Sequence, residues 1–454
     1  MMEKKTFRKI LIANRGEIAV RIIRACRELG IRCVAVYSTA DRNALHAQIA
    51  DEAVCIGPPD TKNSYLNMQA LISACEITGC DALHPGFGFL SENADFARKC
   101  GKCGITFIGP SPEAIEMLGN KAHAKKTMQD AGVPVIRGSE GAVKSLDEAK
   151  KIAREIGYPV LVKASAGGGG RGIRMVEDET QLETQIISAQ QEAKNFFGDD
   201  AVYIEKFIVN PHHVEVQILA DSYGNVVSLG ERDCSMQRRN QKVLEESPSP
   251  LMTEDLRRRM SESAVKASKA SNYCNAGTIE FLVDKNGDYY FMEMNTRIQV
   301  EHPVTEFVTG IDIVKNQIKI AQNEPLPFTQ EDIQIKGHAI ECRINAENPK
   351  SNFRPCPGEI SALHTPGGPG IRIDTAVYQG YTIPPYYDSM IAKLIAYAPT
   401  REEAIMKMRW ALSEFIVEGV DTNIDFQLAL IKDRDFETGN YDNGYLTRNL
   451  AKFI

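Results

Sequence analysis

The sequence predicts a mixed α/β and α+β protein of about three domains that begins with an open parallel sheet. Its length of 454 residues suits about three domains of roughly 150 residues each. The other two observations are a strand–helix–strand pattern at the N-terminus and an acidic β-hairpin at residues 278–295. Hydrophobic residues make up 43% of the chain and charged residues 25%, which excludes a disordered or fibrous protein.

Charge and cysteine content exclude several partners and compartments. The net charge of −7 favours neither nucleic acid nor an anionic membrane surface as a partner. No apolar run approaches the ~18 residues of a membrane helix, and the apolar stretch after the basic N-terminus is too short for a signal peptide. The odd number of 11 cysteines predicts reduced thiols and a cytoplasmic protein.

Cysteines 75, 80, 100 and 103 loosely resemble a zinc site. The first pair is widely spaced, and cysteine commonly packs as a small apolar residue. A zinc site is therefore the weaker interpretation.

Residues 1–110 are predicted to form an open α/β domain. An apolar strand at residues 9–13 is followed by turn residues, a helix at residues 17–29 that Gly30 ends, and a strand at residues 32–38. Such a βαβ unit implies a parallel sheet. Further helices are expected at residues 65–78 and 91–99, and further strands at residues 82–84 and 106–109.

Three segments follow this domain. Ser111 and Pro112 begin a helix, a second is expected at residues 121–130, and residues 111–134 are read as a helical linker. Strands and a glycine run dominate residues 135–208. The remaining residues, 209–454, form a large mixed region.

The hairpin organises the expected chemistry. Asn286-Gly287 predicts a two-residue turn that pairs Lys285 with Asp288. In that register Glu280 lies opposite Glu293, and Asn295 shares their face. The other face is expected to be apolar and to belong to the core: Ile279, Phe281, Val283, Tyr290, Met292 and Met294.

Two carboxylates opposite one another are unfavourable unless something compensates their charge. With the Asn295 oxygen they form an all-oxygen set that suits Mg²⁺ or Mn²⁺, although an exposed acidic hairpin with Lys or Arg partners is an equal alternative. If the chain stays extended, Arg297, Gln299 and Glu301 continue the same face. They would hold a phosphorylated intermediate and supply a general base, and a polar surface strand is the alternative.

A run of four glycines, residues 167–170, follows an apolar strand. Its backbone N–H groups can approach phosphates, and Lys163 and Arg171 add positive charge. A flexible linker is the alternative interpretation. Flanking strands favour a lid that covers phosphates.

At this point the sequence resembles the biotin carboxylase family, which has the ATP-grasp fold. The resemblance covers essentially the whole chain. Besides the glycine loop, the matching stretches are IANRGEIA (12–19), HPGFGFLSEN (84–93), ERDCSMQRR (231–239), EMNTRIQVEHP (293–303), GHAIECR (337–343) and YTIPPYYDSM (381–390).

The resemblance implies an N-terminal pre-ATP-grasp domain, an ATP-grasp region with a mobile lid and a C-terminal biotin carboxylase domain. It also implies a reaction in which ATP and bicarbonate give carboxyphosphate and ADP, and the carboxyl group passes to N1′ of biotin. Two Mg²⁺ or Mn²⁺ ions are the expected metal cofactors. The acceptor beyond biotin stays open among acetyl-CoA (fatty acid synthesis), propionyl-CoA and pyruvate.

Residue roles follow from the resemblance. The expected metal ligands are Glu280, Glu293 and Asn295. Lys242, Arg297, Gln299 and Val300 resemble the bicarbonate pocket, Glu301 the base, and Arg343 the residue that holds biotin. The expected nucleotide contacts are Lys121, Lys163, Gly169, Gly170, Glu205, Lys206, Phe207, Ile208, His213, Gln237, Asn240 and Glu280.

Two positions depart from the family pattern. Asn240 stands where the family usually has His, so one nucleotide contact loses its capacity for charge. Phe87 stands where many members have Tyr, which removes a hydroxyl near the biotin site. Neither change removes a metal ligand, the base or a key arginine, so activity is expected.

Met406-Lys407-Met408 resembles the tripeptide to which biotin is attached in carrier domains, but its surroundings predict a helix at residues 401–412. We therefore expect a biotin carboxyl carrier protein and a carboxyltransferase as separate partner chains. The resemblance also implies a homodimer. Two other functions are weighed: another ATP-grasp ligase acting through an acyl phosphate, and an inactive ATP-binding module, which the presence of Glu293, Arg297 and Glu301 disfavours.

Overall fold

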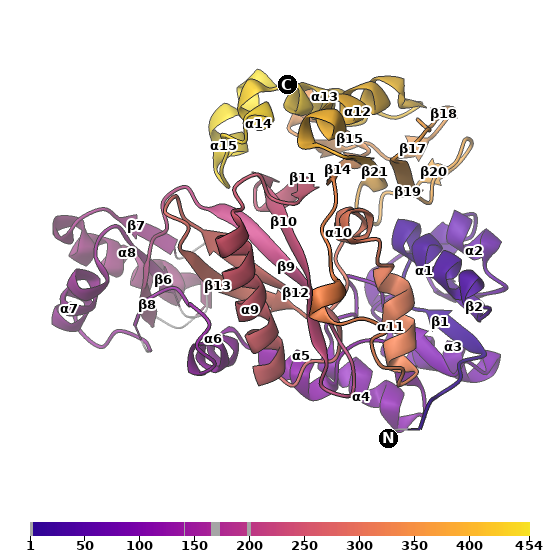
Figure 1. Ribbon diagram of the computed structural model, residues 1–454, viewed down its shortest axis with the longest axis horizontal. Helices are drawn as coiled ribbons and strands as arrows, with labels where there is room; N and C mark the ends of the chain where they lie inside the picture. The colour runs from indigo at the N-terminus through magenta and orange to yellow at the C-terminus, as the bar shows by residue number, and fades with distance from the viewer. Residues whose placement is uncertain (1–2, 140, 165–172, 198–200) are drawn as a thin grey trace. The chain divides into compact units, whose positions relative to one another are not determined.

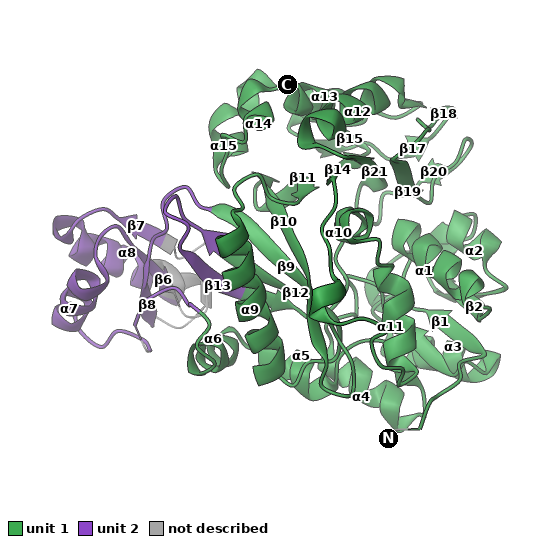
Figure 2. Cartoon of the chain, in the orientation of Figure 1, with its two compact units in different colours: residues 1–133, 212–281, 293–454 green, residues 134–211, 282–292 purple. Residues whose placement is uncertain are grey.

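The computed structural model describes residues 3–139, 141–164, 173–197 and 201–454, and the chain divides into two compact units (Figure 2). Unit 1 comprises residues 1–133, 212–281 and 293–454, and unit 2 comprises residues 134–211 and 282–292. Gly169 and Gly170 of the expected lid lie outside the described residues. No helix among the described residues is long and apolar enough to cross a membrane.

Unit 1 begins with the parallel sheet that the sequence predicts (Figure 1). The strand order is β3-β2-β1-β4-β5, and every neighbouring pair is parallel. The strands are β1 (Lys9–Ile12), β2 (Arg32–Ser38), β3 (Glu52–Gly57), β4 (Ala82–His84) and β5 (Thr106–Phe107). The helices are α1 (Gly16–Glu28), α2 (Leu45–Ile49), α3 (Met68–Thr78), α4 (Ala94–Lys102), α5 (Pro112–Gly119) and α6 (Lys121–Asp130).

Local capping residues set the ends of these helices. Gly30, just beyond α1, has a φ of +70°, a left-handed conformation that suits glycine and ends the helix. The expected helices at residues 65–78 and 91–99 both begin three residues later than predicted. The side chains of Asn67 and Asn93 accept backbone N–H bonds and fix the first turns at Met68 and Ala94.

A second sheet supplies most of the predicted site residues. Its order over the described strands is β13-β12-β9-β10-β11-β14-β21-β19. The strands are β9 (His212–Ala220), β10 (Val226–Arg238), β11 (Gln241–Ser247), β12 (Asn275–Val283), β13 (Tyr289–Asn295), β14 (His338–Asn345), β19 (Ile371–Thr375) and β21 (Met390–Ala398). The longer helices are α9 (Glu254–Ala270), α10 (His302–Thr309), α11 (Ile313–Ala321), α12 (Arg401–Glu414) and α13 (Ile424–Ile431).

Strands β11, β14 and β21 have one charged and one apolar face. Glu245 pairs with Glu341 and Arg343 pairs with Lys393, so these four side chains share a face. The opposite face is apolar and belongs to the core that α12 and α13 complete: Leu244, Cys342, Ile344 and Leu394. Two-residue alternation along each strand therefore separates the buried charges from the core.

Shorter elements complete unit 1: β15 (Glu347–Asn348), β16 (Arg354–Pro355), β17 (Gly358–Glu359), β18 (Ala362–His364), β20 (Thr382–Ile383), β22 (Ile416–Glu418), α14 (Arg434–Glu437) and α15 (Tyr445–Asn449).

The described part of unit 2 is a small antiparallel sheet with two helices. Strand β6 (Val160–Ala164) lies between β7 (Ile173–Val176) and β8 (Val202–Lys206). The helices are α7 (Leu146–Ile156) and α8 (Glu179–Phe197). Alternate valines of β6, Val160 and Val162, are fully buried in the core of this unit.

The turn of the acidic hairpin differs from the prediction. Asp284 N–H donates to Asp288 O and Gly287 N–H donates to Asp284 O, so Asp284 and not Lys285 faces Asp288. Gly287 adopts a φ of +78°, which widens the expected two-residue turn to three residues. Met292 is exposed, although it was expected in the core. Counting back from the observed turn places Glu280 opposite Met292, so the expected pairing of Glu280 with Glu293 no longer follows from the turn and stays a prediction.

Candidate active site

Lys242 of β11 lies at the centre of a buried cluster of carboxylates in unit 1. Its Nζ lies 2.6 Å from Glu215 Oε2, 3.0 Å from Glu280 Oε1 and 2.7 Å from Glu301 Oε1. All three carboxylates are buried. Two residues that the sequence places far apart, Glu280 and Glu301, thus share one ammonium group.

Arg232 of β10 is fully buried and forms hydrogen bonds to side chains of this cluster. Its Nε donates to Glu215 Oε1 at 2.6 Å and its Nη2 donates to Gln299 Oε1 at 2.6 Å. Gln299 Nε2 in turn donates to Glu280 Oε1 at 2.9 Å. Neither Arg232 nor Glu215 is among the site residues predicted from the sequence. The signal was a charged residue inside an otherwise buried apolar strand, as Glu215 is between Val214 and Val216.

Arg343 of β14 contacts the other oxygen of Glu301. Its Nη2 lies 3.1 Å from Glu301 Oε2, and its Nε donates to Glu245 Oε1 at 2.6 Å. Glu301 is therefore bonded to a cation on each side, Lys242 and Arg343. Glu245 is a further buried residue that the sequence analysis did not select.

Residues 296–301 do not continue the strand, and this corrects the expectation of one extended face. Strand β13 ends at Asn295, and Glu301 is the N-cap of α10 with φ −81° and ψ 10°. Pro303 in the first turn of α10 suits a helix start, because its missing N–H would have no helical partner there. The side chains of Gln299 and Glu301 meet through tertiary contacts with Lys242 and Arg232.

Neighbouring charges determine the ionisation of these groups. Burial alone would raise the pKa of Glu301, but Lys242 and Arg343 bring it below its ordinary value. Burial also opposes ionisation of Glu215, yet Lys242 and Arg232 lower its pKa to about 2. Burial would lower the pKa of Lys242, but Glu215 and Glu301 raise it well above the usual value. Glu301 is thus an ionised proton acceptor at neutral pH.

Of the predicted metal ligands, Glu280 of β12 and Asn295 of β13 contact each other. Asn295 Nδ2 donates to Glu280 Oε1 at 2.9 Å, and His213 Nε2 lies 3.1 Å from Glu280 Oε2. Glu293 is partly exposed, with Lys121 Nζ 3.6 Å from its Oε2. Two carboxylates and an amide oxygen fit a hard divalent cation that keeps several positions for water or phosphate.

Arg297 is oriented by two acceptors. Its Nε donates to Glu92 Oε2 at 3.0 Å and its Nη2 donates to Asn295 Oδ1 at 2.9 Å. Glu92 also accepts the Thr296 N–H at 3.1 Å, so it fixes both the backbone and the side chain where β13 ends.

The predicted nucleotide contacts divide between the two units. In unit 1, Gln237 Nε2 donates to His213 Nδ1 at 3.1 Å, and Asn240 lies in the turn between β10 and β11 with a φ of +63°. In unit 2, Lys163 Nζ lies 2.5 Å from Glu205 Oε2. Lys206 Nζ donates to Gly157 O at 2.9 Å, so its ammonium group holds a backbone turn.

Phe207 and Ile208 follow β8 directly. The Phe207 N–H donates to Pro159 O at 3.1 Å, and Ile208 is buried. At the second position that departs from the family pattern, Asn14 Nδ2 donates to the carbonyl of Phe87 at 2.7 Å, an interaction that does not need a Tyr hydroxyl.

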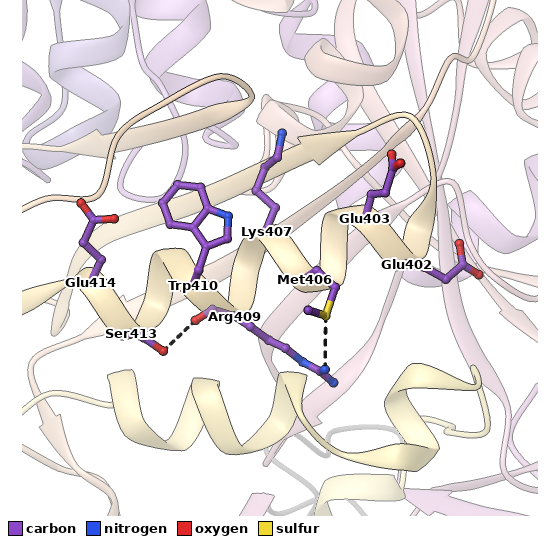
Figure 3. A pocket seen from close by; sticks show the side chains of 8 residues that line it. All are labelled: Glu402, Glu403, Met406, Lys407, Arg409, Trp410, Ser413 and Glu414. Carbon is purple, nitrogen blue, oxygen red and sulfur yellow. Dashed lines mark hydrogen bonds between the residues drawn. The ribbon is translucent and has the colours of Figure 1, made fainter.

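A surface pocket lies on α12, away from these residues in the sequence (Figure 3). It is lined by Glu402, Glu403, Met406, Lys407, Arg409, Trp410, Ser413 and Glu414. Lys407 Nζ donates to Pro369 O and Tyr397 O at 2.8 Å each. Helix α12 confirms the predicted helix, and Met406-Lys407-Met408 is not the hairpin tip of a carrier domain.

Among the described residues, Cys75, Cys80, Cys100 and Cys103 belong to no cluster of three or more His, Cys, Asp or Glu side chains close enough to share a metal ion. All 11 cysteines are free thiols. The described residues therefore give the zinc interpretation no support.

Three family profiles match the chain in succession. They are "Biotin carboxylase, N-terminal domain" over residues 6–115, "Carbamoyl-phosphate synthase L chain, ATP binding domain" over residues 120–329 and "Biotin carboxylase C-terminal domain" over residues 341–448. The chain is 58% identical to biotin carboxylase 1 of Bacillus subtilis over 97% of its own length and 98% of that protein. The chain belongs to the biotin carboxylase family. The resemblance and the enzyme class predicted from the sequence are thereby confirmed.

Other members of the biotin carboxylase family extend the comparison. A pyruvate carboxylase subunit of Methanothermobacter thermautotrophicus is 55% identical, over 95% of this chain and 88% of that protein. The biotin carboxylase domain dimer of the Hydrogenobacter thermophilus 2-oxoglutarate carboxylase, solved with MgADP, ADP and bicarbonate, has a TM-score of 0.90 and 52% identity, with 99% of each chain covered. The predicted fold class is confirmed with it.

Proposed function

We propose that this chain carboxylates biotin on a separate carrier protein, using ATP and bicarbonate through carboxyphosphate and releasing ADP and phosphate. The observation that carries the proposal is Glu301, a buried ionised carboxylate bonded to Lys242 on one side and to Arg343 on the other. Glu301, the proton acceptor, thus lies between the Lys242 ammonium group, which suits the bicarbonate anion, and the Arg343 guanidinium, which suits the planar ureido group of biotin.

In the first step, Glu301 takes the proton of bicarbonate. A bicarbonate oxygen forms a bond to the γ-phosphorus of ATP, and the bond from that phosphorus to the oxygen of ADP breaks. Lys242 and Arg297 hold the anion, with Gln299 and Val300 beside them. The main contribution of these residues is position and charge neutralisation, which is what phosphoryl transfer requires.

In the second step, N1′ of biotin forms a bond to the carboxyl carbon of carboxyphosphate. The carbon–oxygen bond to phosphate breaks, and the N1′ proton leaves with the phosphate. Arg343 orients the ureido oxygen and stabilises the negative charge that develops there, while Glu245 and Glu301 orient Arg343.

Metal and nucleotide contacts complete the proposal. Glu280, Glu293 and Asn295 would hold Mg²⁺ or Mn²⁺, which neutralises charge on the transferring phosphoryl group when bound. Lys121, Lys163, His213, Gln237 and Asn240 would contact the nucleotide. The segment Glu205, Lys206, Phe207 and Ile208 would contact the adenine, and Gly169 and Gly170 would cover the phosphates.

We further propose a biotin carboxyl carrier protein and a carboxyltransferase as partner chains, and a homodimer. Support comes from the relative solved as a dimer and from the relative named as part of a pyruvate carboxylase. A reducing, cytoplasmic location is supported by 11 cysteines that are all free thiols. The final acceptor is left open among acetyl-CoA, propionyl-CoA and pyruvate.

The test is ADP release by the purified chain with Mg-ATP and bicarbonate, with and without free biotin. We expect release that requires bicarbonate and rises with biotin. ADP release that does not depend on bicarbonate or on biotin would indicate another ATP-grasp ligase. Tight ATP binding without turnover, even with a carrier protein added, would indicate an inactive module.

A further inference from the structure

The backbone carbonyls of Gln299 and Val300 each accept a hydrogen bond from a buried side chain. Residues 299–301, here called the catalytic turn, carry Gln299 and Glu301 on either side of Val300. Lys393 Nζ of β21 donates to Val300 O at 2.8 Å, and His302 Nδ1 donates to Gln299 O at 2.8 Å. The backbone of the catalytic turn is therefore held by two side chains that contact neither the Gln299 amide nor the Glu301 carboxylate in the bonds described above.

Lys393 is completely buried, and carboxylates from two other elements surround it. Its Nζ lies 3.2 Å from Glu17 Oε2 of α1 and 3.6 Å from Asp374 Oδ2 of β19. Burial would lower the pKa of Lys393, but Glu17, Glu341 and Asp374 raise it above its usual value. The side chain is thus an ammonium group with donors only.

Neutralising Asp374 does not require Lys393. Arg372 already binds Asp374 through two bonds, Nε to Oδ1 at 2.9 Å and Nη2 to Oδ2 at 2.7 Å. Neither oxygen of Glu341 accepts a hydrogen bond from the described residues, and Glu17 meets Lys393 only as an ion pair, with Oε2 3.2 Å from Nζ. Burying the ammonium group of Lys393 costs desolvation free energy. Its hydrogen bond to Val300 O, in the catalytic turn, is therefore the contact that needs a functional explanation.

We propose that Lys393 is a positioning residue for the bicarbonate step, acting by fixing the peptide between Val300 and Glu301. The inference rests on the proposed function. The peptide is planar and trans, so fixing Val300 O also fixes the Glu301 N–H and the direction in which the chain enters Glu301. The carboxylate of Glu301 is then held where Lys242 and Arg343 meet it.

The test compares three variants with the wild type. Lys393→Met combined with Glu17→Gln removes the donor together with a neighbouring carboxylate, so that no extra charge is left buried. Lys393→Gln keeps a shorter donor. Lys407→Met is the matched control, because Lys407 also donates to two backbone carbonyls, one of them on β21, but lies on α12. Steady-state kinetics for bicarbonate and ATP, and thermal unfolding, are measured for each.

We expect kcat/KM for bicarbonate to fall by about 100-fold in the double variant, because a small displacement of a reacting group can cost that much. Lys393→Gln is expected to show a smaller loss. KM for ATP should stay within about twofold of wild type in all variants. Lys407→Met should match wild type in both substrates.

If both Lys393 variants had the same kcat/KM for bicarbonate as Lys407→Met, the inference would be overturned. Equal losses for ATP and bicarbonate, or loss of folding in both Lys393 variants, would also overturn it, because the role would then be structural. A wild-type enzyme without bicarbonate-dependent ADP release would instead overturn the proposed function, and this inference with it.

Discussion

Glu301 and Arg343 form an ion pair in which carboxylate Oε2 lies 3.1 Å from guanidinium Nη2. The other oxygen of Glu301 lies 2.7 Å from Lys242 Nζ. The same carboxylate therefore contacts the residue proposed to hold bicarbonate and the residue proposed to hold biotin. Proton transfer and carboxyl transfer would take place at adjacent atoms, so little motion of the intermediate is needed between them.

Glu301→Gln should abolish most bicarbonate-dependent ADP release. Loss of a general base reduces the rate by about 10²- to 10⁴-fold. Nucleotide binding, measured by calorimetry, should change little. Glu324→Gln is the control, because Glu324 pairs only with the exposed Lys4 among the ion pairs of the described residues. Bicarbonate-dependent turnover within twofold of wild type would contradict the role of Glu301.

Arg343→Lys should keep a positive charge but lose the planar fork of donors. We expect biotin-stimulated turnover to fall by about 10²-fold, the scale seen when one stabilising donor is removed. ADP release in the absence of biotin should be less affected. The exposed Arg354 supplies a matched control as Arg354→Lys. Equal losses with and without biotin would assign Arg343 to the bicarbonate step.

Glu280→Gln and Glu293→Gln should each weaken divalent metal binding by at least about 10-fold, because each removes a charged oxygen ligand. Mn²⁺ binding measured by calorimetry tests this without relying on turnover. Unchanged Mn²⁺ affinity in both variants would contradict metal binding and leave pairing with Lys242 and Lys121 as the role of these two carboxylates.

Stability should depend on pH through Glu246, which is buried between His338 and Arg401. His338 Nε2 lies 2.6 Å from Glu246 Oε2, and Arg401 Nε lies 2.7 Å from the same oxygen. Burial opposes ionisation, yet His338 and Arg401 lower the pKa of Glu246 to about 2 from an ordinary 4.5. Because the folded pKa is the lower one, this stabilisation is present above pH ~4.5 and is lost as the pH falls towards ~2.

Urea unfolding of wild type and Glu246→Gln at several pH values between ~7 and ~3.5 measures this contribution. We expect the variant to be less stable at neutral pH and the difference to shrink as the pH falls. A difference that stays constant, or grows in acid, would show that Glu246 does not titrate as described.

Local patterns predicted much of the fold. The alternation of strand and helix indicated the parallel sheet of residues 1–110, and the helix start signal at Pro399-Thr400 indicated helix α12. Boundaries were less certain because single side chains set them, as Asn67 and Asn93 do. The hairpin turn was one residue too short because Gly287 in a left-handed conformation suits both turn lengths.

The site was predicted through motifs and only partly through geometry. Counting alternate residues extended β13 to Glu301, whereas Glu301 precedes α10 and reaches Lys242 by tertiary packing. Glu215 and Arg232 come from separate strands, and a charge within a buried apolar strand marks such a residue but not its partner. Their convergence follows only from the order β9-β10-β11 in the sheet. Lys393 is a similar case, because its contact with Val300 O joins β21 to a distant turn.

The most direct test of the proposed function is transfer of label from bicarbonate to the biotin of a purified carrier protein. Wild type and Glu301→Gln are compared with Mg-ATP, and carrier without biotin serves as the blank. We expect acid-labile label on the biotinylated carrier with wild type and almost none with Glu301→Gln. Label at equal rates with both proteins, or no label with wild type in the presence of ATP, bicarbonate and carrier, would contradict it.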